Sequence, residues 1–399
     1  MPLSHERRTV VTIALGTAQT LSWASTYYLP AILAVPMASD FGITTDWVYG
    51  IFSVAMLMTA FMGPAVGRRI DSFGGRGVLI VSSLVFAAGL GLLGWSPNLP
   101  VFVVAWLIVG LGMGMGLYEA AFAALTAIYG RGARGAITGV TLLAGFASTI
   151  GWPVSALVEA EMGWRATCYV WALAHLLLAL PIYVFMIPKE LGAHVSIEAA
   201  APAPDAAPLW NRQMLLLAFA FAATWITSTA MAAHLPRLLE DAGATKTVAI
   251  AAAALVGPAQ VAARVLEFSL LQRFHPLLSA RLASVTHPIG AVAVLLLGAP
   301  AAYFFTIIHG AGNGVMTIAK GTLPLAIFGP VGYGRRQGLL AAPSRFGQAA
   351  SPFVFAVLIE RFGAGALMFT AGLCAAGFIA MLLLRAEAPD ALNASVKSS

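Results

Sequence analysis

Three basic residues lie inside long apolar stretches of the sequence: Arg264, Lys320 and Arg345. A charged side chain is costly in hydrocarbon, so each of them must face protein, water or a ligand. Counted along helices at about 1.5 Å per residue, the three lie at similar depth, one or two helical turns inside their segments. They can therefore converge on one site, and a bound organic anion would neutralise its excess positive charge.

Two acidic residues bear on this charge balance. Glu267 follows Arg264 by three residues, so the two share a helix face and can form a structural pair. Glu119 is the other carboxylate expected deep in an apolar segment. It can carry a coupling proton, hydrogen-bond to a neighbouring helix, or serve as the counter-charge of one basic residue. Interhelical pairing or snorkelling are also open explanations of the basic residues.

Further polar residues are expected to complete a pocket. Gln260 and Asn313 can orient a carboxylate or a hydroxyl of the substrate. His309, near the middle of its segment, is a second proton-coupling candidate, although a hydrogen bond between helices explains a lone intramembrane histidine equally well. Tyr27 and Tyr28 are candidate substrate contacts, but an interfacial aromatic belt is the favoured explanation for them.

The segments that carry these residues are typical of membrane helices. Of the 399 residues, 60% are hydrophobic and 10% are charged, and the mean hydropathy is +0.87, values typical of a chain solvated largely by lipid. The first run is too long for a cleaved signal peptide. An all-α integral membrane fold is predicted, with twelve apolar runs of spanning length: 9–36, 44–66, 77–94, 100–128, 135–160, 164–188, 213–238, 245–271, 279–297, 299–326, 336–361 and 363–384.

The distribution of basic residues predicts the orientation. With the N-terminus inside, fifteen of the 22 lysines and arginines fall in cytoplasmic segments, and only Arg165, Arg237, Lys246 and Arg361 fall in outside segments. By the positive-inside bias both termini are expected in the cytoplasm. The net charge of +6 then reflects topology and not nucleic-acid binding, and we expect a multi-pass protein of the inner membrane.

The chain is expected to consist of two similar six-helix halves. A Pro- and Ala-rich segment, 189–212, is interpreted as a cytoplasmic linker between bundles at 1–188 and 213–384, with a cytoplasmic tail at 385–399. Short motifs recur about 200 residues apart, which indicates duplication. They are Gly112, Gly114 and Gly116 with Gly310, Gly312 and Gly314, Ile128-Tyr129-Gly130 with Ile327-Phe328-Gly329, and Pro153 with Pro352.

The loop between the second and third runs reads Gly-Arg-Arg-Ile-Asp-Ser-Phe-Gly-Gly-Arg over residues 67–76. It resembles the signature G-x-x-x-D-x-x-G-x-R of the major facilitator superfamily, with Gly67, Asp71, Gly74 and Arg76 at its fixed positions. The resemblance implies twelve helices in two pseudo-symmetric bundles, transport by alternating access, a cytoplasmic latch at this loop, and a monomer as the working unit.

A narrower resemblance concerns residues 260–264, Gln-Val-Ala-Ala-Arg. The segment resembles one in the monocarboxylate transporters, where an Asp precedes by four residues an Arg that binds the substrate carboxylate. Arg264 matches the Arg, but Gln260 replaces the Asp and cannot ionise, so proton symport by that route is not implied. Oxalate transport proteins are similar in using basic residues at the places of Arg264 and Arg345.

Together these features predict a secondary transporter of a small organic anion, most simply a monocarboxylate, with protons as a candidate co-substrate. A drug/proton antiporter is an alternative, although residues 145–153 do not reproduce the antiporter signature G-x-x-x-G-P-x-x-G-G and basic residues disfavour cationic cargo. A transporter-like ligand sensor is the other alternative, but the linker and tail are short for an output region. No HExxH, G-x-S-x-G, Cys/His cluster or P-loop occurs, so we expect neither an enzyme nor a cofactor.

Overall fold

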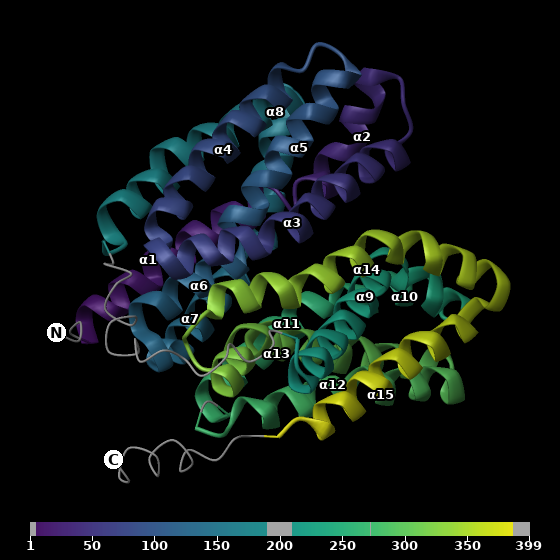
Figure 1. Ribbon diagram of the computed structural model, residues 1–399. Coiled ribbons are helices and arrows are strands. Elements are labelled where there is room, and N and C mark those ends of the chain that lie inside the picture. The colour runs from purple at the N-terminus through teal and green to yellow at the C-terminus, as the bar shows by residue number, and fades with distance from the viewer. Residues whose placement is uncertain (1–4, 190–209, 272, 386–399) are drawn as a thin grey trace, which may run out of the picture.

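The computed structural model describes residues 5–189, 210–271 and 273–385, and these residues contain helices and no strand. The helices form two bundles that lie side by side (Figure 1). The linker expected at 189–212 and the tail expected at 385–399 lie almost entirely outside the described residues.

The N-terminal half contains helices that correspond to the first six apolar runs. They are α1 His5–Ser25, α2 Pro30–Phe41, α3 Thr45–Phe73, α4 Gly75–Trp95, α5 Leu99–Gly116, α6 Tyr118–Tyr129, the 3-10 turn η1 Gly130–Ala133, α7 Arg134–Ala144, α8 Ala147–Ala174, and the π-helical turns η2 His175–Ala179 and η3 Ile182–Met186.

The C-terminal half matches the other six runs. It contains α9 Arg212–Asp241, α10 Lys246–Ala254, α11 Val256–Leu266, the π-helical turn η4 Glu267–Leu271, α12 Pro276–Leu297, the 3-10 turn η5 Ala299–Ala301, α13 Ala302–Phe328, α14 Tyr333–Phe362, the 3-10 turn η6 Gly363–Ala366 and α15 Leu367–Leu383.

Within the described ranges, seven helical stretches are long and apolar enough to cross a membrane, and Leu99–Met186 and Tyr333–Leu383 each contain more than one of the expected runs.

The first run is not the continuous helix that the sequence pattern suggests. It is divided between α1 and α2, because Pro30 has no backbone N–H with which to continue the hydrogen-bond ladder. At the break the N–H of Tyr28 reaches back five residues to the carbonyl of Trp23, 3.1 Å away. Because of this break, the side chains of Tyr27 and Tyr28 point in directions that they would not have in a continuous helix.

Glycines let equivalent helices approach closely in the two halves. Small residues at helix crossings are the usual means of close packing in lipid. At four glycines named below, an added side chain would overlap an atom of the neighbouring helix. The glycines with equivalent contacts in the two halves are 200 residues apart. The contacts are Gly110 with Ala55 and Gly112 with Phe86 in the N-terminal half, and Gly310 with Val256 and Gly312 with Thr286 in the C-terminal half.

The two halves meet most closely along α3 and α14 (Figure 1). A Cβ at Gly63 would lie 3.2 Å from the Cα of Gly338, and one at Gly67 would overlap the carbonyl of Gly334. From this closed end, where residues 67–76 and 329–336 lie, the ribbons diverge toward α2 and α10. The polar contacts between the halves described below lie at the closed end or at mid-depth, so the bundles are joined at one end of the molecule.

Candidate functional site

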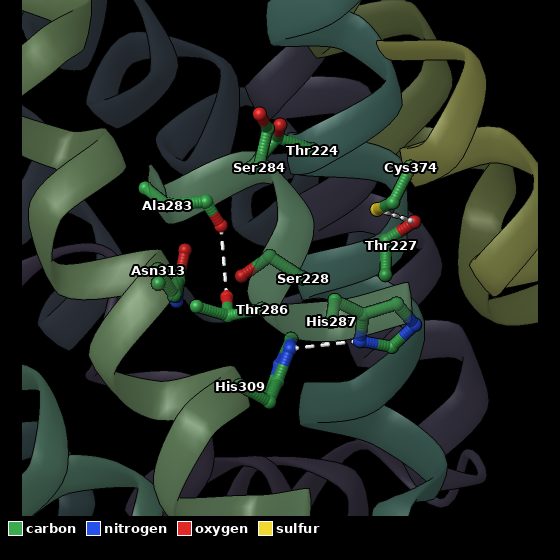
Figure 2. A pocket seen from close by; sticks show the side chains of 11 residues that line it. Thr224, Thr227, Ser228, Ala283, Ser284, Thr286, His287, His309, Asn313 and Cys374 are labelled. Atoms are coloured by element: carbon green, nitrogen blue, oxygen red, sulfur yellow. Dashed lines mark hydrogen bonds between the residues drawn. The ribbon is translucent and has the colours of Figure 1, made fainter. Parts of the chain in front are cut away.

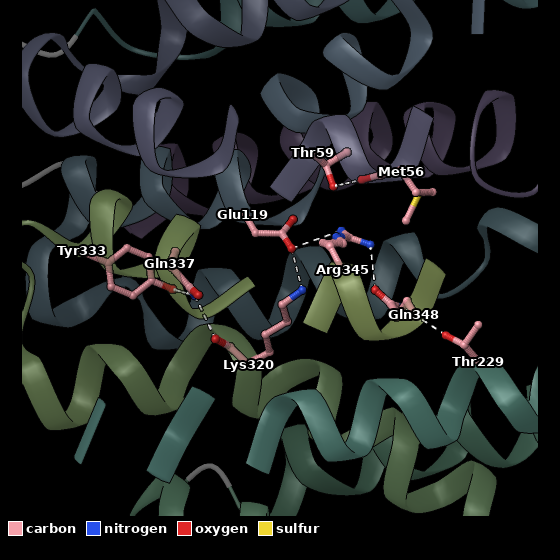
Figure 3. Close-up of polar contacts among 9 residues, drawn as sticks. All are labelled: Met56, Thr59, Glu119, Thr229, Lys320, Tyr333, Gln337, Arg345 and Gln348. Carbon is pink, nitrogen blue, oxygen red and sulfur yellow. Dashed lines mark hydrogen bonds and ion pairs between the residues drawn. The ribbon is translucent and has the colours of Figure 1, made fainter. Parts of the chain in front are cut away.

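One carboxylate from the N-terminal half binds two cations from the C-terminal half (Figure 3). The Glu119 Oε1 atom lies 2.6 Å from the Lys320 Nζ atom and 3.2 Å from a terminal nitrogen of Arg345. The exposed fractions of these side chains are 14% for Glu119, 8% for Lys320 and 5% for Arg345. This basic cluster, formed by the three residues, carries one net positive charge.

The helix geometry places Glu119 at the seam between the halves. Leu117 has an extended backbone conformation between α5 and α6, and Glu119 lies in the first turn of α6. On the other side, the Tyr333 hydroxyl donates to the Gly321 carbonyl at 2.6 Å, and the Gln337 amide donates to the Lys320 carbonyl at 2.8 Å. These bonds fix α14 against α13 beside the lysine, and Figure 3 shows the one from Gln337 to Lys320.

The two cations have further partners within their own half. Arg345 donates to the Gln348 side-chain oxygen at 3.3 Å, and the Gln348 amide donates to the Thr229 hydroxyl at 3.3 Å. The Lys320 ammonium lies 5.1 Å from the centroid of the Trp225 ring, within cation–π range. The basic cluster is therefore anchored to α9 as well as to α13 and α14.

Arg264 is a third buried cation, only 6% exposed, and forms no ion pair within the described residues. Its guanidinium donates to four neutral oxygens: the Thr141 carbonyl at 3.2 Å, the Gly314 carbonyl and the Gln260 side chain at 3.4 Å, and the Thr317 hydroxyl at 3.5 Å. Most of these distances are long for hydrogen bonds. The charge of Arg264 is thus solvated weakly and is not compensated.

The structural pair of Arg264 with Glu267, which the sequence left open, is not formed. Glu267 begins the π-helical turn η4, which changes its direction relative to Arg264. It is 1% exposed and lies 3.6 Å from Arg134 of the other half. Arg134 also donates to the carbonyl of Phe274 at 2.5 Å. Glu267 is therefore a contact between the halves at the closed end and not the counter-charge of Arg264.

Four aromatic residues of the N-terminal half form a wall beside the cations. Trp23 lies 5.1 Å from Tyr27 and 4.8 Å from Tyr118 between ring centroids, and Tyr27 lies 5.4 Å from Tyr28. The side chains of Tyr27 and Tyr28 are half-buried. Both tyrosines therefore belong to a packed aromatic group that includes Tyr118, the chain neighbour of Glu119.

His309 and Asn313 line two cavities in the C-terminal half, of about 20 Å³ and about 200 Å³. The His309 Nδ1 atom lies 3.0 Å from the Nδ1 atom of His287 on α12 (Figure 2). Gln260 lines the larger cavity and contacts Arg264. The larger cavity therefore connects His309 and Asn313 to the surroundings of Arg264.

The signature loop joins the two halves through Asp71. Its carboxylate oxygens accept hydrogen bonds from the backbone amides of Gly334 at 2.8 Å and Arg335 at 2.9 Å, in the first turn of α14. An anion at a helix N-terminus satisfies unpaired N–H groups and interacts favourably with the helix dipole. Gly67 permits the close backbone approach of α3 and α14 that this contact requires.

The other two signature residues act within the N-terminal half. Gly74 has a φ of 81°, a conformation that favours glycine, and separates α3 from α4. Arg76 donates to the carbonyl of Val184 at the end of the sixth run. These contacts fix the loop that presents Asp71.

Comparison with known proteins decides the family. The model of the Major Facilitator Superfamily matches residues 15–319 of the chain. The protein belongs to this superfamily. The prediction made from residues 67–76 and from the twelve apolar runs is therefore confirmed, and the protein is a multi-pass membrane protein of this superfamily.

Two curated members of the superfamily are similar over part of their length. The chain is 29% identical over 142 residues to an uncharacterised MFS-type transporter, YcnB, of Bacillus subtilis. The aligned segment covers 35% of this chain and 30% of that protein. It is 28% identical over 170 residues to the probable sulfoacetate transporter SauU of Cupriavidus necator. This aligned segment covers 42% of this chain and 39% of that protein. The chain thus spans well under half of either relative.

Solved structures share the fold over nearly the whole chain. The human organic anion transporter MFSD10 (TETRAN) superposes with a TM-score of 0.67 at 16% identity, covering 95% of this chain and all of that one. FucP, in the outward conformation, superposes with a TM-score of 0.73 at 15% identity, covering 94% of this chain and 99% of that one. At these identities the likeness shows the fold alone.

Several site residues were not singled out from the sequence. Trp225, Tyr118 and Thr141 lie in apolar runs, where an aromatic or small polar residue has no signal of its own. His287 could have been found, because a histidine inside an apolar run is as unusual there as His309. No group of three metal-ligating side chains occurs among the residues that the structure describes.

Proposed function

We propose that this transporter carries a small organic anion, most simply a monocarboxylate, across the inner membrane by alternating access. The observation that carries the proposal is the charge balance at the seam: Lys320 and Arg345 share one carboxylate, and Arg264 has none among the described residues. Buried charge without a partner is costly. A bound anion supplies the missing charge, in keeping with the names of SauU and MFSD10.

Arg264 is the proposed clamp for the carboxylate. Its present acceptors are neutral oxygens at 3.2 to 3.5 Å, whereas a carboxylate offers two charge-assisted bonds in the fork geometry of a guanidinium. The exchange of weak bonds for strong ones favours binding. Gln260 and Asn313 line the larger cavity and are proposed to orient the rest of the molecule, and Tyr27 and Tyr28 are proposed as further substrate contacts.

Lys320 and Arg345 supply a second positive field, and Glu119 is their counter-charge when no substrate is bound. A substrate carboxylate competes with Glu119 for these cations. Because Glu119 belongs to the N-terminal half and the cations to the other half, that competition loosens a contact between the halves at the moment of binding. Substrate binding is thereby coupled to the rocking motion that alternating access requires.

The closed end faces the cytoplasm in this proposal, because the basic loops are expected there. Asp71 at the first turn of α14 and Glu267 beside Arg134 then close the cytoplasmic side. Opening to the cytoplasm requires both contacts to break, which is the latch role proposed for Gly67, Asp71, Gly74 and Arg76. One chain supplies every residue of the site, so a monomer suffices.

The test begins with ligands. Thermal stability of the purified protein is measured with small carboxylates, sulfonates such as sulfoacetate, amino acids and bulky amphipathic cations, since a ligand that binds only the folded state raises apparent stability. We expect stabilisation by one or a few organic anions. Stabilisation by amphipathic cations alone would contradict the proposal and favour the drug/proton antiporter.

Uptake of the stabilising anion into proteoliposomes is then compared between wild type, Arg264→Gln and the control Arg273→Gln, which changes an exposed arginine bonded to its own turn. Loss of a buried charged partner costs a few kcal/mol, so we expect uptake by Arg264→Gln to fall at least about 30-fold while the control keeps it. Normal uptake by folded Arg264→Gln would refute the clamp. Binding without any transport would instead indicate a sensor.

A further inference from the structure

We propose that His287 and His309 form a proton-binding site inside the C-terminal half, distinct from the basic cluster, and that a proton bound there strengthens anion binding. The inference rests on the proposed function only in taking the coupled cargo to be an anion. Both rings are 5% exposed, and Phe305 packs against them with ring centroids 5.4 Å from His287 and 5.8 Å from His309.

The geometry of the pair sets its proton count. The two Nδ1 atoms lie 3.0 Å apart (Figure 2), so one Nδ1 must carry a hydrogen and the other must accept it. When both rings are neutral, the donating ring has a bare Nε2 atom and the accepting ring carries its hydrogen on Nε2. A further proton can therefore bind at the bare Nε2 without breaking the bond between the rings.

The surroundings are polar but uncharged. The smaller cavity is lined from α9 by Thr224, Thr227 and Ser228, and from α15 by Cys374, the other titratable group that faces the pair. None of the residues that line either cavity is an acid, a lysine or an arginine. The positive charge that a bound proton creates is thus solvated by hydroxyl groups, and its natural counter-charge is the transported anion.

The buried Nε2 atom of His287 can form a further hydrogen bond. This atom has no hydrogen-bond partner among the residues that the structure describes, a situation that costs free energy for either tautomer. A cavity of about 20 Å³ adjoins it, which is room for one water molecule. His309, by contrast, also lines the cavity of about 200 Å³. Protons therefore reach the pair from the side of His309.

One face of α13 connects the pair to the clamp. His309, Asn313 and Thr317 are spaced by four residues and lie on one helix face. The Thr317 hydroxyl donates to the Asn313 carbonyl at 2.9 Å and accepts from Arg264 at 3.5 Å. The eight residues from His309 to Thr317 correspond to about 12 Å along the helix. At that distance a second positive charge strengthens anion binding about tenfold at an effective dielectric constant of about 20.

The coupling is reciprocal. If a proton at His309 strengthens anion binding, a bound anion strengthens proton binding by the same factor. The pair and the anion then load together from the same side and are released together. This arrangement gives proton and anion symport without an ionisable residue at position 260.

The first test needs no substrate. Diethyl pyrocarbonate labels neutral imidazole, so the rate of labelling at His309, read by mass spectrometry of its peptide and normalised to total protein, reports proton binding. We expect the rate to fall on acidification in wild type and in the control His234→Asn. In His287→Asn we expect the midpoint to shift by at least about 0.5 pH unit, because the Nδ1 partner is changed. No labelling, a flat rate, or an unchanged midpoint in His287→Asn would overturn the proposal.

The second test measures flux. Proteoliposomes that contain a pH-sensitive dye receive a sulfoacetate gradient, and proton movement and radiolabelled counterflow are recorded. We expect wild type and His234→Asn to move protons with the anion, and His309→Asn to lose proton movement more than tenfold while counterflow falls less than threefold. Proton movement retained in His309→Asn overturns the inference. Anion transport without proton movement in wild type overturns it too and leaves the proposed function standing. No anion transport at all counts against the proposed function, and the labelling result then decides the histidine site.

Discussion

The two halves of this protein repeat the same helix packing but contribute different side chains to the candidate site. Gly112 and Gly312 make equivalent close contacts with the neighbouring helix. Yet the N-terminal half contributes aromatic rings and one carboxylate to the site, and the C-terminal half contributes all three buried cations. Glu119 and Lys320, which pair across the seam, are 201 residues apart, nearly the spacing of the equivalent glycines. The backbone contacts are thus alike in the two halves, while side chains at similar places carry opposite charges.

Because of this difference, anion binding at the seam can be linked to movement of one half against the other. Neither half balances the buried charges of the candidate site: the C-terminal half holds three cations, and among the described residues the ion-pair partners of Glu119 all belong to that half. In the proposed function the seam is therefore both the binding site and a contact that must change during transport. The closed end, where glycine backbones touch, supplies the pivot.

The largest effect is expected from a wedge at the pivot. Leu in place of Gly67 would overlap the backbone of Gly334 and Arg335, and overpacking costs about 1–3 kcal/mol. We expect Gly67→Leu to be folded but to lose at least about 99% of uptake, because the closed end can no longer form. Proteoliposome uptake is the measurement, with Gly77→Leu as control, since a Cβ at Gly77 meets no atom within 4 Å. Full activity of Gly67→Leu would show that the halves need not meet there.

The second-largest effect is expected from removing the carboxylate that pairs with two cations of the other half. Glu119→Gln leaves Lys320 and Arg345 without a carboxylate, and breaking a buried pair costs about 3–5 kcal/mol. We expect a lower melting temperature in the absence of anion and a larger stabilisation by the transported anion than in wild type. The double variant Glu119→Gln/Lys320→Met should recover part of the loss, as measured by a double-mutant cycle.

The same Glu119→Gln variant separates the roles left open for this carboxylate. If it keeps full pH-dependent accumulation, Glu119 is a counter-charge and not the proton carrier. Loss of pH dependence with normal counterflow would instead assign the coupling proton to Glu119.

The smallest effects are expected from the two carboxylates that close the same end. Asp71 accepts two backbone amides at 2.8 and 2.9 Å, whereas Glu267 lies 3.6 Å from Arg134. Hydrogen bonds to a charged group contribute about 1.5–3 kcal/mol. We therefore expect Asp71→Asn to lower turnover about tenfold with the KM for the anion changed less than twofold, and Glu267→Gln to lower turnover less. Steady-state uptake kinetics give both constants, and equal effects would show that the two closures are equivalent.

Most of the fold was predictable because the lipid environment permits few solutions. Helices must satisfy their own backbone groups in hydrocarbon, so long apolar runs identify spans, and residues 67–76 identify the family. The breaks were not predictable in position. Pro30 divides the first run and Gly163, with a φ of 81°, turns the chain inside α8, and both depend on what the neighbouring helices require.

The candidate site was predictable only in part. Charges in apolar runs stand out, so Arg264, Lys320, Arg345 and Glu119 were found from the sequence alone. Their pairing was not, because it depends on helix rotation. The π-helical turn at Glu267 directs that residue toward Arg134 and away from Arg264.

The sequence by itself determined that this protein spans a membrane, belongs to a family with twelve helices, and keeps costly charges inside it. The tertiary structure alone decided that Glu119 binds two cations while Arg264 binds none of the described carboxylates, and that His309 faces His287. The physical reason is that burial cost is a property of each residue and its segment, whereas an ion pair or a shared proton depends on distances of a few ångströms between segments far apart in the chain.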